Sequence, residues 1–364
     1  MSNTIALEIC IQAGEPCVSW GSPGTGKTKW EEALCNHFDW LNIQMIASTR
    51  EPVDFSGMPV IQEDGTVTLQ PIGRWFKDVM TTKKKRVIVH FDEISTAPPA
   101  VQAALLKLIH EKIYGEHILP DYVSFIASAN PPDEAANGWA MTPPMANRFF
   151  HFFWNPTTDD WIQGMISGWQ NQTFQVLPDN WKDLIPSHRS LVASFIKTRP
   201  NLLQDMPKDE SARGYAWPSR RSWDMAARLL ADGASISASK DINRTLVSGC
   251  VGDGVAVEFV SWLDALDLPN PEDLLKDPSS FKMPARGDQL FAILTSVTTA
   301  VLQNNTASRW YAGWKVLEEV IRQNKPDVAA IAAIALANNQ PNGASIPPTL
   351  NAFGPLLKKV GVIS

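Results

Sequence analysis

The chain has 364 residues and a mass of 40.2 kDa, and 44% of its residues are apolar and 19% charged. This balance is typical of a folded globular protein with two or three domains, and it excludes a disordered or fibrous chain. The net charge of −6 and the isoelectric point near 5.6 argue against non-specific binding to nucleic acid or to an anionic membrane, although a local basic face stays possible. We find no basic leader and no apolar run of membrane-spanning length, and we therefore expect a cytoplasmic protein.

The first 155 residues alternate short apolar runs with helical stretches, which predicts an α/β domain with a mostly parallel sheet. The expected strands are 16–20, 42–47, 86–91, 123–129 and 149–154, and the expected helices are 27–38 and 99–111. Two β-hairpins interrupt this alternation. One covers residues 60–69 with Asp64-Gly65 at its turn, and the other covers residues 112–123 with Gly115 at or near its turn.

Helical patterns dominate after residue 155. The expected helices are 159–169, 189–197, 221–230 and 256–266. Prolines at 269 and 271 end the last of these and mark a boundary near residue 268, after which about four more helices are expected.

A glycine-rich octapeptide carries the strongest functional signal. The segment Gly21-Ser22-Pro23-Gly24-Thr25-Gly26-Lys27-Thr28 matches GxxxxGK[ST], and it lies between an expected strand and an expected helix. In such a P-loop the backbone N–H groups and the helix N-terminus bind phosphate oxygens. Lys27 would contact the β- and γ-phosphates and the Thr28 hydroxyl would ligate Mg²⁺. An incidental glycine turn is the weaker interpretation, because the flanking strand and helix fit the motif.

A pair of acids follows the apolar strand 86–91. Asp92 in this position would help to hold Mg²⁺ from outside the ion's direct ligands, and Glu93 would polarise an attacking water. The alternative is that Asp92 only caps a helix. His90, inside the strand, is predicted to be a hydrogen-bonded core residue and not a metal ligand. The four cysteines have no metal-site spacing and are predicted to be buried thiols: Cys10, Cys17, Cys35 and Cys250.

Together these residues resemble the AAA+ ATPases of the MoxR type, which include the dynein-related and CbbQ/NorQ-like proteins. The resemblance rests on the two motifs above and on the segments Asp92–Leu106, Ser128–Pro132, Ala146–Phe149 and Arg220–Trp223. It covers residues 1 to about 232. It implies an AAA+ α/β nucleotide-binding core at 1–155, a helical lid at 156–268 and a helical C-terminal extension at 269–364.

The resemblance also implies roles for further residues. Asn130 matches sensor 1, an amide that orients the attacking water, and an ordinary Asn-Pro turn is the alternative. Arg148 matches the arginine finger that reaches the ATP of a neighbouring subunit, and a surface ion pair is the alternative. Arg221 fits sensor 2 best, at the start of a lid helix. Arg220 immediately before it leaves open which arginine contacts phosphate.

The function implied by the resemblance is ATP-driven remodelling of a protein complex. The cofactors would be ATP and Mg²⁺, the assembly a ring and most simply a hexamer, and the partner a protein with a von Willebrand factor A domain. The hairpins would contact the substrate, with Tyr114 as a candidate contact, unless they are only surface decoration. Two alternatives are a nucleic-acid-directed motor and a protein that binds ATP without hydrolysing it. Apart from residues 83–86 we find no basic stripe with interleaved aromatic residues, which disfavours the motor, and the complete set of motif residues, with the water-activating Glu93, disfavours the non-hydrolysing protein.

Overall fold

The computed structural model describes residues 4–131, 134, 140–167, 172–323, 326–345, 347–348 and 353. The chain forms two compact units. The first consists of Met1–Pro178 and Gln204–Val257, and the second of Asp179–Leu203 and Glu258–Ser364. The three-part division of the chain at residues 155 and 268 stays a prediction.

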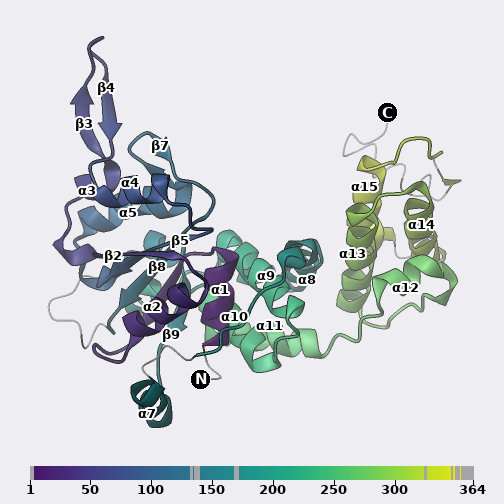
Figure 1. Ribbon diagram of the computed structural model, residues 1–364. Helices are drawn as coiled ribbons and strands as arrows, with labels where there is room; N and C mark the ends of the chain where they lie inside the picture. Colours follow the sequence, from purple (N-terminus) through teal and green to yellow (C-terminus); the bar gives the residue numbers. More distant parts are fainter. Residues whose placement is uncertain are drawn as a thin grey trace. The chain divides into compact units, whose positions relative to one another are not determined.

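A five-stranded parallel sheet forms the centre of the first unit (Figure 1). Its strand order is β2-β5-β8-β1-β9. The strands are β1 (Cys17–Trp20), β2 (Leu41–Ile46), β5 (Val87–Asp92), β8 (Val123–Ala129) and β9 (Phe150–Phe153). All five predicted strands are confirmed, each to within one residue at its ends. The central strands β1 and β8 are buried throughout because both faces of a parallel sheet are covered by helices.

The helices of this unit are α1 (Ile5–Ala13), α2 (Lys27–His37), α3 (Val53–Ser56), α4 (Arg74–Thr81), α5 (Pro99–Glu111), α6 (Pro143–Ala146), α7 (Thr158–Ser167), α9 (Arg220–Ser235) and α10 (Lys240–Val251). The predictions for α2 and α5 are confirmed. Helix α1 was not predicted because six of its nine residues are buried, so that it lacks the one-sided apolar pattern of a surface helix. It packs against α9 and α10.

Two hairpins extend this unit, as predicted (Figure 1). The first is formed by β3 (Met58–Ile61) and β4 (Val67–Gln70), and Gly65 in its turn has a φ of +82°. The second, β6 (Ile113–Tyr114) with β7 (His117–Ile118), is shorter than predicted because Val123 already belongs to β8. Its turn contains Gly115 at a φ of +62°.

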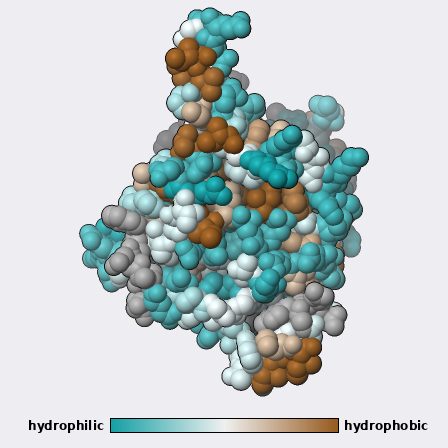
Figure 2. Space-filling model, turned by 60° about the vertical axis from the view of Figure 1, so that its left-hand side comes forward, coloured by the Kyte–Doolittle hydropathy of each residue, from teal (hydrophilic) through white to brown (hydrophobic). Residues whose placement is uncertain are grey.

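The second hairpin supports the base of the first. The Tyr114 side chain is fully buried, its ring stacks on Trp75 at 4.9 Å, and its hydroxyl accepts hydrogen bonds from the N–H groups of Ile72 and Gly73. The prediction that Tyr114 contacts a substrate is therefore wrong, because the side chain is used in packing. The first hairpin carries four exposed apolar side chains (Figure 2), which are Met58, Val60, Ile61 and Val67, and the second hairpin exposes Ile118.

The second unit is helical. It contains α8 (Ile185–Thr198), α12 (Pro271–Lys276), α13 (Gly287–Gln303), α14 (Ala307–Arg322) and α15 (Pro326–Asn338), while α11 (Asp253–Asp264) runs from one unit into the other. Two buried tryptophans, Trp310 and Trp314, pack in its core with side chains of α12, α13 and α15. The four helices predicted after residue 269 are confirmed.

A buried histidine gives the first unit a predictable pH dependence. His151 on β9 accepts a hydrogen bond from Trp20 Nε1 and donates one to the carbonyl oxygen of Ala146. Burial lowers the pKa of His151 from 6.5 to about 4. Between these two pH values His151 is protonated in the unfolded chain and neutral in the folded chain. The stability that the fold has above pH 6.5 is therefore lost as the pH falls toward 4. We expect this histidine to account for about 3 kcal/mol of that loss. Urea denaturation of His151→Gln, which keeps a donor and an acceptor, would show a flatter pH profile.

Candidate nucleotide site

The predicted P-loop connects β1 to α2. Gly24 and Gly26 have φ angles of +77° and +93°, which glycine adopts at little cost. Gly26 is the N-cap of α2 and provides no side-chain cap, so the first N–H groups of the helix face the loop without a side-chain acceptor from the cap residue. A Cβ atom on Gly21 would lie 2.7 Å from the Trp154 carbonyl oxygen, and only glycine fits there.

Lys27 lies over this loop. Its Nζ donates hydrogen bonds to the carbonyl oxygens of Gly21 and Ser22, at 2.6 and 2.9 Å. Burial lowers the pKa of Lys27, and the carboxylates of Asp92 and Glu134 act in the opposite direction. A half-buried ammonium group, a glycine loop with open space around Gly24 and a helix N-terminus together fit the phosphates of a nucleotide.

The acidic pair lies where the sequence places it, at the carboxyl end of β5. Asp92 Oδ1 accepts a hydrogen bond from the Glu93 N–H at 2.9 Å. Glu93 adopts a left-handed conformation with a φ of 55°, which is uncommon for a residue with a side chain. Thr28, at the start of α2, and Asp92 carry oxygen atoms of the kind that Mg²⁺ prefers, and they are the residues that could hold this ion.

A hydroxyl that sequence reasoning missed contacts the second acid. Ser48, in the short helix η1 (Ala47–Thr49) after β2, donates a hydrogen bond to Glu93 Oε2 at 2.9 Å. Sequence spacing gives no signal for this contact, because the residues are 45 positions apart and meet only through the pairing of β2 with β5.

Asn130 follows β8, the strand between β5 and β1. The parallel strand ends therefore bring Asn130 to the same edge of the sheet as the P-loop, Asp92 and Glu93. The Ser95 hydroxyl donates to the Asn130 carbonyl oxygen at 3.5 Å.

Arg148 lies at the opposite edge. It precedes β9, whose first residue, Phe150, pairs with Cys17 at the start of β1, whereas the P-loop follows the end of β1. The strand between them separates the two ends by roughly 10 Å. Arg148 Nη1 donates to the Pro144 carbonyl oxygen at 2.6 Å.

Hydrogen bonds to Asn147, the residue before Arg148, hold the first turn of α9 in place. Ser219, the N-cap of α9, donates a hydrogen bond to Asn147 Oδ1 at 2.6 Å, and Asn147 Nδ2 donates to the Trp217 carbonyl oxygen. Burial lowers the pKa of Arg148, and the positive charge of Arg221 lowers it further. Arg221 thus lies near Arg148, and both charges also act on His110, whose pKa is lowered first by burial. Arg220 is exposed in the same turn.

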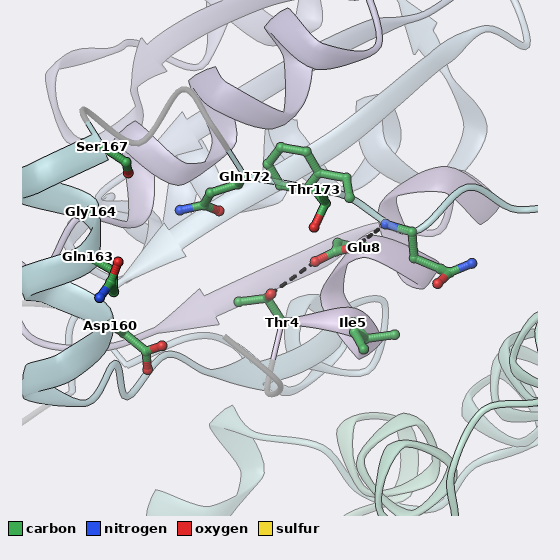
Figure 3. Close-up of a pocket in the computed structure, with 11 residues that line it drawn as sticks. Thr4, Ile5, Glu8, Asp160, Gln163, Gly164, Ser167, Gln172 and Thr173 are labelled. Atoms are coloured by element: carbon green, nitrogen blue, oxygen red, sulfur yellow. Dashed lines mark hydrogen bonds between the residues drawn. The ribbon is translucent and has the colours of Figure 1, made fainter.

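A polar cavity of about 600 Å³ lies between α1 and α7 (Figure 3). On its floor Glu8 accepts hydrogen bonds from the Thr4 hydroxyl and the Gln175 N–H. Burial raises the pKa of Glu8, while these two donors act against that shift. Phe174 lines the cavity and contacts Trp30 on α2, so the cavity and the helix that follows the P-loop share one packed wall.

Comparison with known families identifies the domain that holds these residues. Residues 20–149 match the family model of the AAA domain, dynein-related subfamily. The chain carries an AAA domain. The match includes the whole P-loop, the acidic pair, Asn130 and Arg148, and it ends before Arg220 and Arg221.

The solved structures that match the chain include two proteins of low sequence identity. A protein titled "putative ATPase" from Cytophaga hutchinsonii is 18% identical, with a TM-score of 0.42 over 67% of this chain and 79% of that one. A full-length MCM homologue from Methanopyrus kandleri is 13% identical, with a TM-score of 0.35 over 72% of this chain and 53% of that one. A search of curated proteins finds no match to the sequence. Among the described helices, none has the length and apolar character needed to cross a membrane.

Proposed function

We propose that this protein is a Mg²⁺-dependent ATPase of the MoxR type, with ATP bound between the subunits of a ring. The observation that carries the proposal is the placement of its polar residues at two edges of one sheet. The P-loop, Asp92, Glu93 and Asn130 share the carboxyl edge, whereas Arg148 lies at the amino edge with Arg221 near it.

The residues at the carboxyl edge have complementary chemistry. Lys27 binds the β- and γ-phosphates, and Thr28 and Asp92 hold the metal ion. When bound, Mg²⁺ offsets negative charge on the phosphates. Glu93 accepts a proton from the attacking water, and Asn130 orients that water.

Arg148 lies too far along the strand to reach the phosphates of its own chain. In a head-to-tail ring, the amino edge of one subunit meets the carboxyl edge of the next, and the guanidinium groups then offset charge in the transition state. We extend this role from Arg148 to Arg221, because the two charges act on each other. Heterologous contacts of this kind close into a ring when the rotation between subunits permits, and a hexamer is the assembly we propose.

The work of the ring is the remodelling of a protein complex, with a protein that contains a von Willebrand factor A domain as partner. The exposed apolar side chains of the first hairpin support contact with another protein. The hairpin is attached through the second hairpin to the end of α5, the helix that follows the acidic pair. A movement around Glu93 can therefore be transmitted through α5 and the second hairpin to the exposed apolar side chains of the first hairpin.

The test of an intersubunit site is the rate of ATP hydrolysis per subunit over a dilution series of the full chain. We expect the rate per subunit to rise with protein concentration and to level off where light scattering detects the assembled ring. A rate per subunit that is independent of concentration, together with a monomer at every concentration, would contradict the proposal.

A further inference from the structure

Two charged residues are buried directly beneath the proposed ATP site. Glu31 on α2 is 3% exposed and His90 on β5 is fully buried. Nδ1 of His90 lies 2.9 Å from Oε2 of Glu31, and its Nε2 lies 2.7 Å from the hydroxyl of Ser128 on β8. The prediction that His90 is a core residue is confirmed, and its Nε2 is hydrogen-bonded to Ser128; its Nδ1 lies within ion-pair distance of Glu31 but makes no hydrogen bond of regular geometry. Most positions of such strands are apolar, because burying a charged group costs free energy unless it is paired.

The three side chains connect the three elements that carry the proposed catalytic groups. Glu31 lies one helical turn after Lys27. His90 precedes Asp92 by two residues and Ser128 precedes Asn130 by two residues, so that each shares a sheet face with the polar residue at the end of its own strand. The contacts Glu31–His90–Ser128 therefore run across α2, β5 and β8 at one depth below the site.

The charges that face His90 come from each of its neighbours. Burial lowers the pKa of His90, and the positive charge of Lys27 lowers it further. The carboxylates of Glu31 and Asp92 raise it, and the resulting pKa lies above the ordinary value. The pair places a carboxyl group and an imidazole 2.9 Å apart in the interior, where most of the neighbouring side chains are apolar. Buried ion pairs contribute little net stability, and their better-attested use is to specify one arrangement of the elements they join.

A small cavity adjoins this group. It has room for about one water molecule, with a volume near 10 Å³. Its lining includes Ser19, Lys27, Trp30, Glu31 and Ser128. Among the described residues, Oε1 of Glu31 and Nε1 of Trp30 are buried without a hydrogen-bond partner. A bound water would supply the missing partner to such groups.

We infer that Glu31, His90 and Ser128 are positioning residues for ATP hydrolysis, which hold the helix of Lys27 in register with Asp92 and Asn130 and retain one water beside Glu31. The inference rests on the proposed ATPase function. It assigns these residues no contact with ATP. Their loss should therefore lower the turnover rate and leave ATP binding nearly unchanged.

The test removes the charged pair and keeps the packing, in the double variant Glu31→Leu/His90→Leu of the full chain. Replacing a buried ion pair with apolar side chains of similar size is often neutral or stabilising, so we expect the double variant to fold with an unchanged or higher thermal midpoint. We expect its kcat to fall about tenfold or more, since small misplacements of catalytic groups have effects of this size. The Kd for ATP, measured by titration calorimetry, should stay within about twofold of the wild-type value.

A matched pair of single variants covers the case in which the double variant does not fold. Ser128 and Ser124 are both buried on β8, four residues apart and on the same face, but Ser124 lies toward the far end of the strand. We expect Ser128→Ala to lower kcat several-fold and Ser124→Ala to leave it unchanged, with ATP affinity retained in both.

The outcomes separate the two proposals. Wild-type turnover in the folded double variant, or equal kcat values in the two serine variants, would overturn the positioning role and leave the ATPase proposal intact. A wild-type chain that hydrolyses no ATP at any concentration would overturn the proposed function and this inference with it.

Discussion

Replacing Glu93 with glutamine is expected to abolish ATP hydrolysis and to preserve ATP binding. Glutamine matches glutamate in shape and can still accept the hydrogen bond from Ser48, but its amide cannot take a proton from water. Loss of a general base lowers rates by about 10² to 10⁴. The measurement is steady-state phosphate release, with the Kd for ATP determined on the same preparation.

The control for this variant is an acid-to-amide change away from the sheet. Glu318 on α14 pairs with Arg322 one turn later, an exposed helical pair of little energetic weight. Glu318→Gln should hydrolyse ATP at the wild-type rate. Residual turnover above about a tenth of the wild-type rate in Glu93→Gln would show that another group activates the water, and would contradict the role proposed for Glu93.

The sequence was sufficient to predict the sheet and the residues at its carboxyl edge. Each strand is a short run rich in apolar residues, and each functional group at that edge ends or directly follows a strand or begins a helix. The position of Asp92 or Asn130 therefore follows from the end of its own strand. For these residues, the local sequence pattern is enough to predict where the side chain lies in the fold.

Contacts between distant segments could not be predicted in this way. The hydrogen bond of Ser48 to Glu93 depends on the order of two strands, and the burial of Glu31 depends on a histidine on another strand. On a helix pattern, Glu31 is indistinguishable from the neighbouring, partly exposed Glu32. The burial of Tyr114 could not be predicted either, because its hydrogen-bond partners lie in the segment after the first hairpin and its sequence neighbours suggest a surface residue.

Which segments of the chain make up each unit also depends on contacts between distant residues. Residues 179–203 pack with the chain after Glu258, although residues 204–257 between them belong to the first unit. Helix α8 packs on α13, about a hundred residues later, and Ser194 contacts Thr295 across that pair. An amphipathic pattern shows which face of a helix is buried but not against which helix.

Mixing two inactive variants is expected to restore ATP hydrolysis. Arg148→Ala alone should lose about 10³-fold or more in rate, because an arginine supplied to the transition state has an effect of that size. Glu93→Gln alone is inactive for the reason given above. In a mixed ring, some interfaces combine the intact Glu93 of an Arg148→Ala subunit with the intact Arg148 of a Glu93→Gln subunit.

Such an interface has a complete set of groups only when Arg148 acts on the ATP of the neighbouring subunit. With random mixing in equal amounts, about a quarter of the interfaces are complete, and we expect up to about a quarter of the wild-type rate. The control is each variant at the same total concentration, mixed with Lys27→Ala chains that keep both Glu93 and Arg148. Adding Lys27→Ala to Arg148→Ala should also restore activity, whereas adding it to Glu93→Gln should not, because no chain in that mixture has both the P-loop lysine and the water-activating acid.

The same design decides the role of Arg221. If Arg221 acts beside Arg148 on the neighbouring ATP, Arg221→Ala is rescued by Glu93→Gln chains; if it binds the ATP of its own chain, no rescue occurs. Failure of Arg148→Ala and Glu93→Gln to complement each other, in rings shown by light scattering to be mixed, would contradict an intersubunit site. The separation of Arg148 from the P-loop along β9 leads us to expect rescue, since no side-chain rotation within one chain brings the guanidinium group to the opposite edge of the sheet.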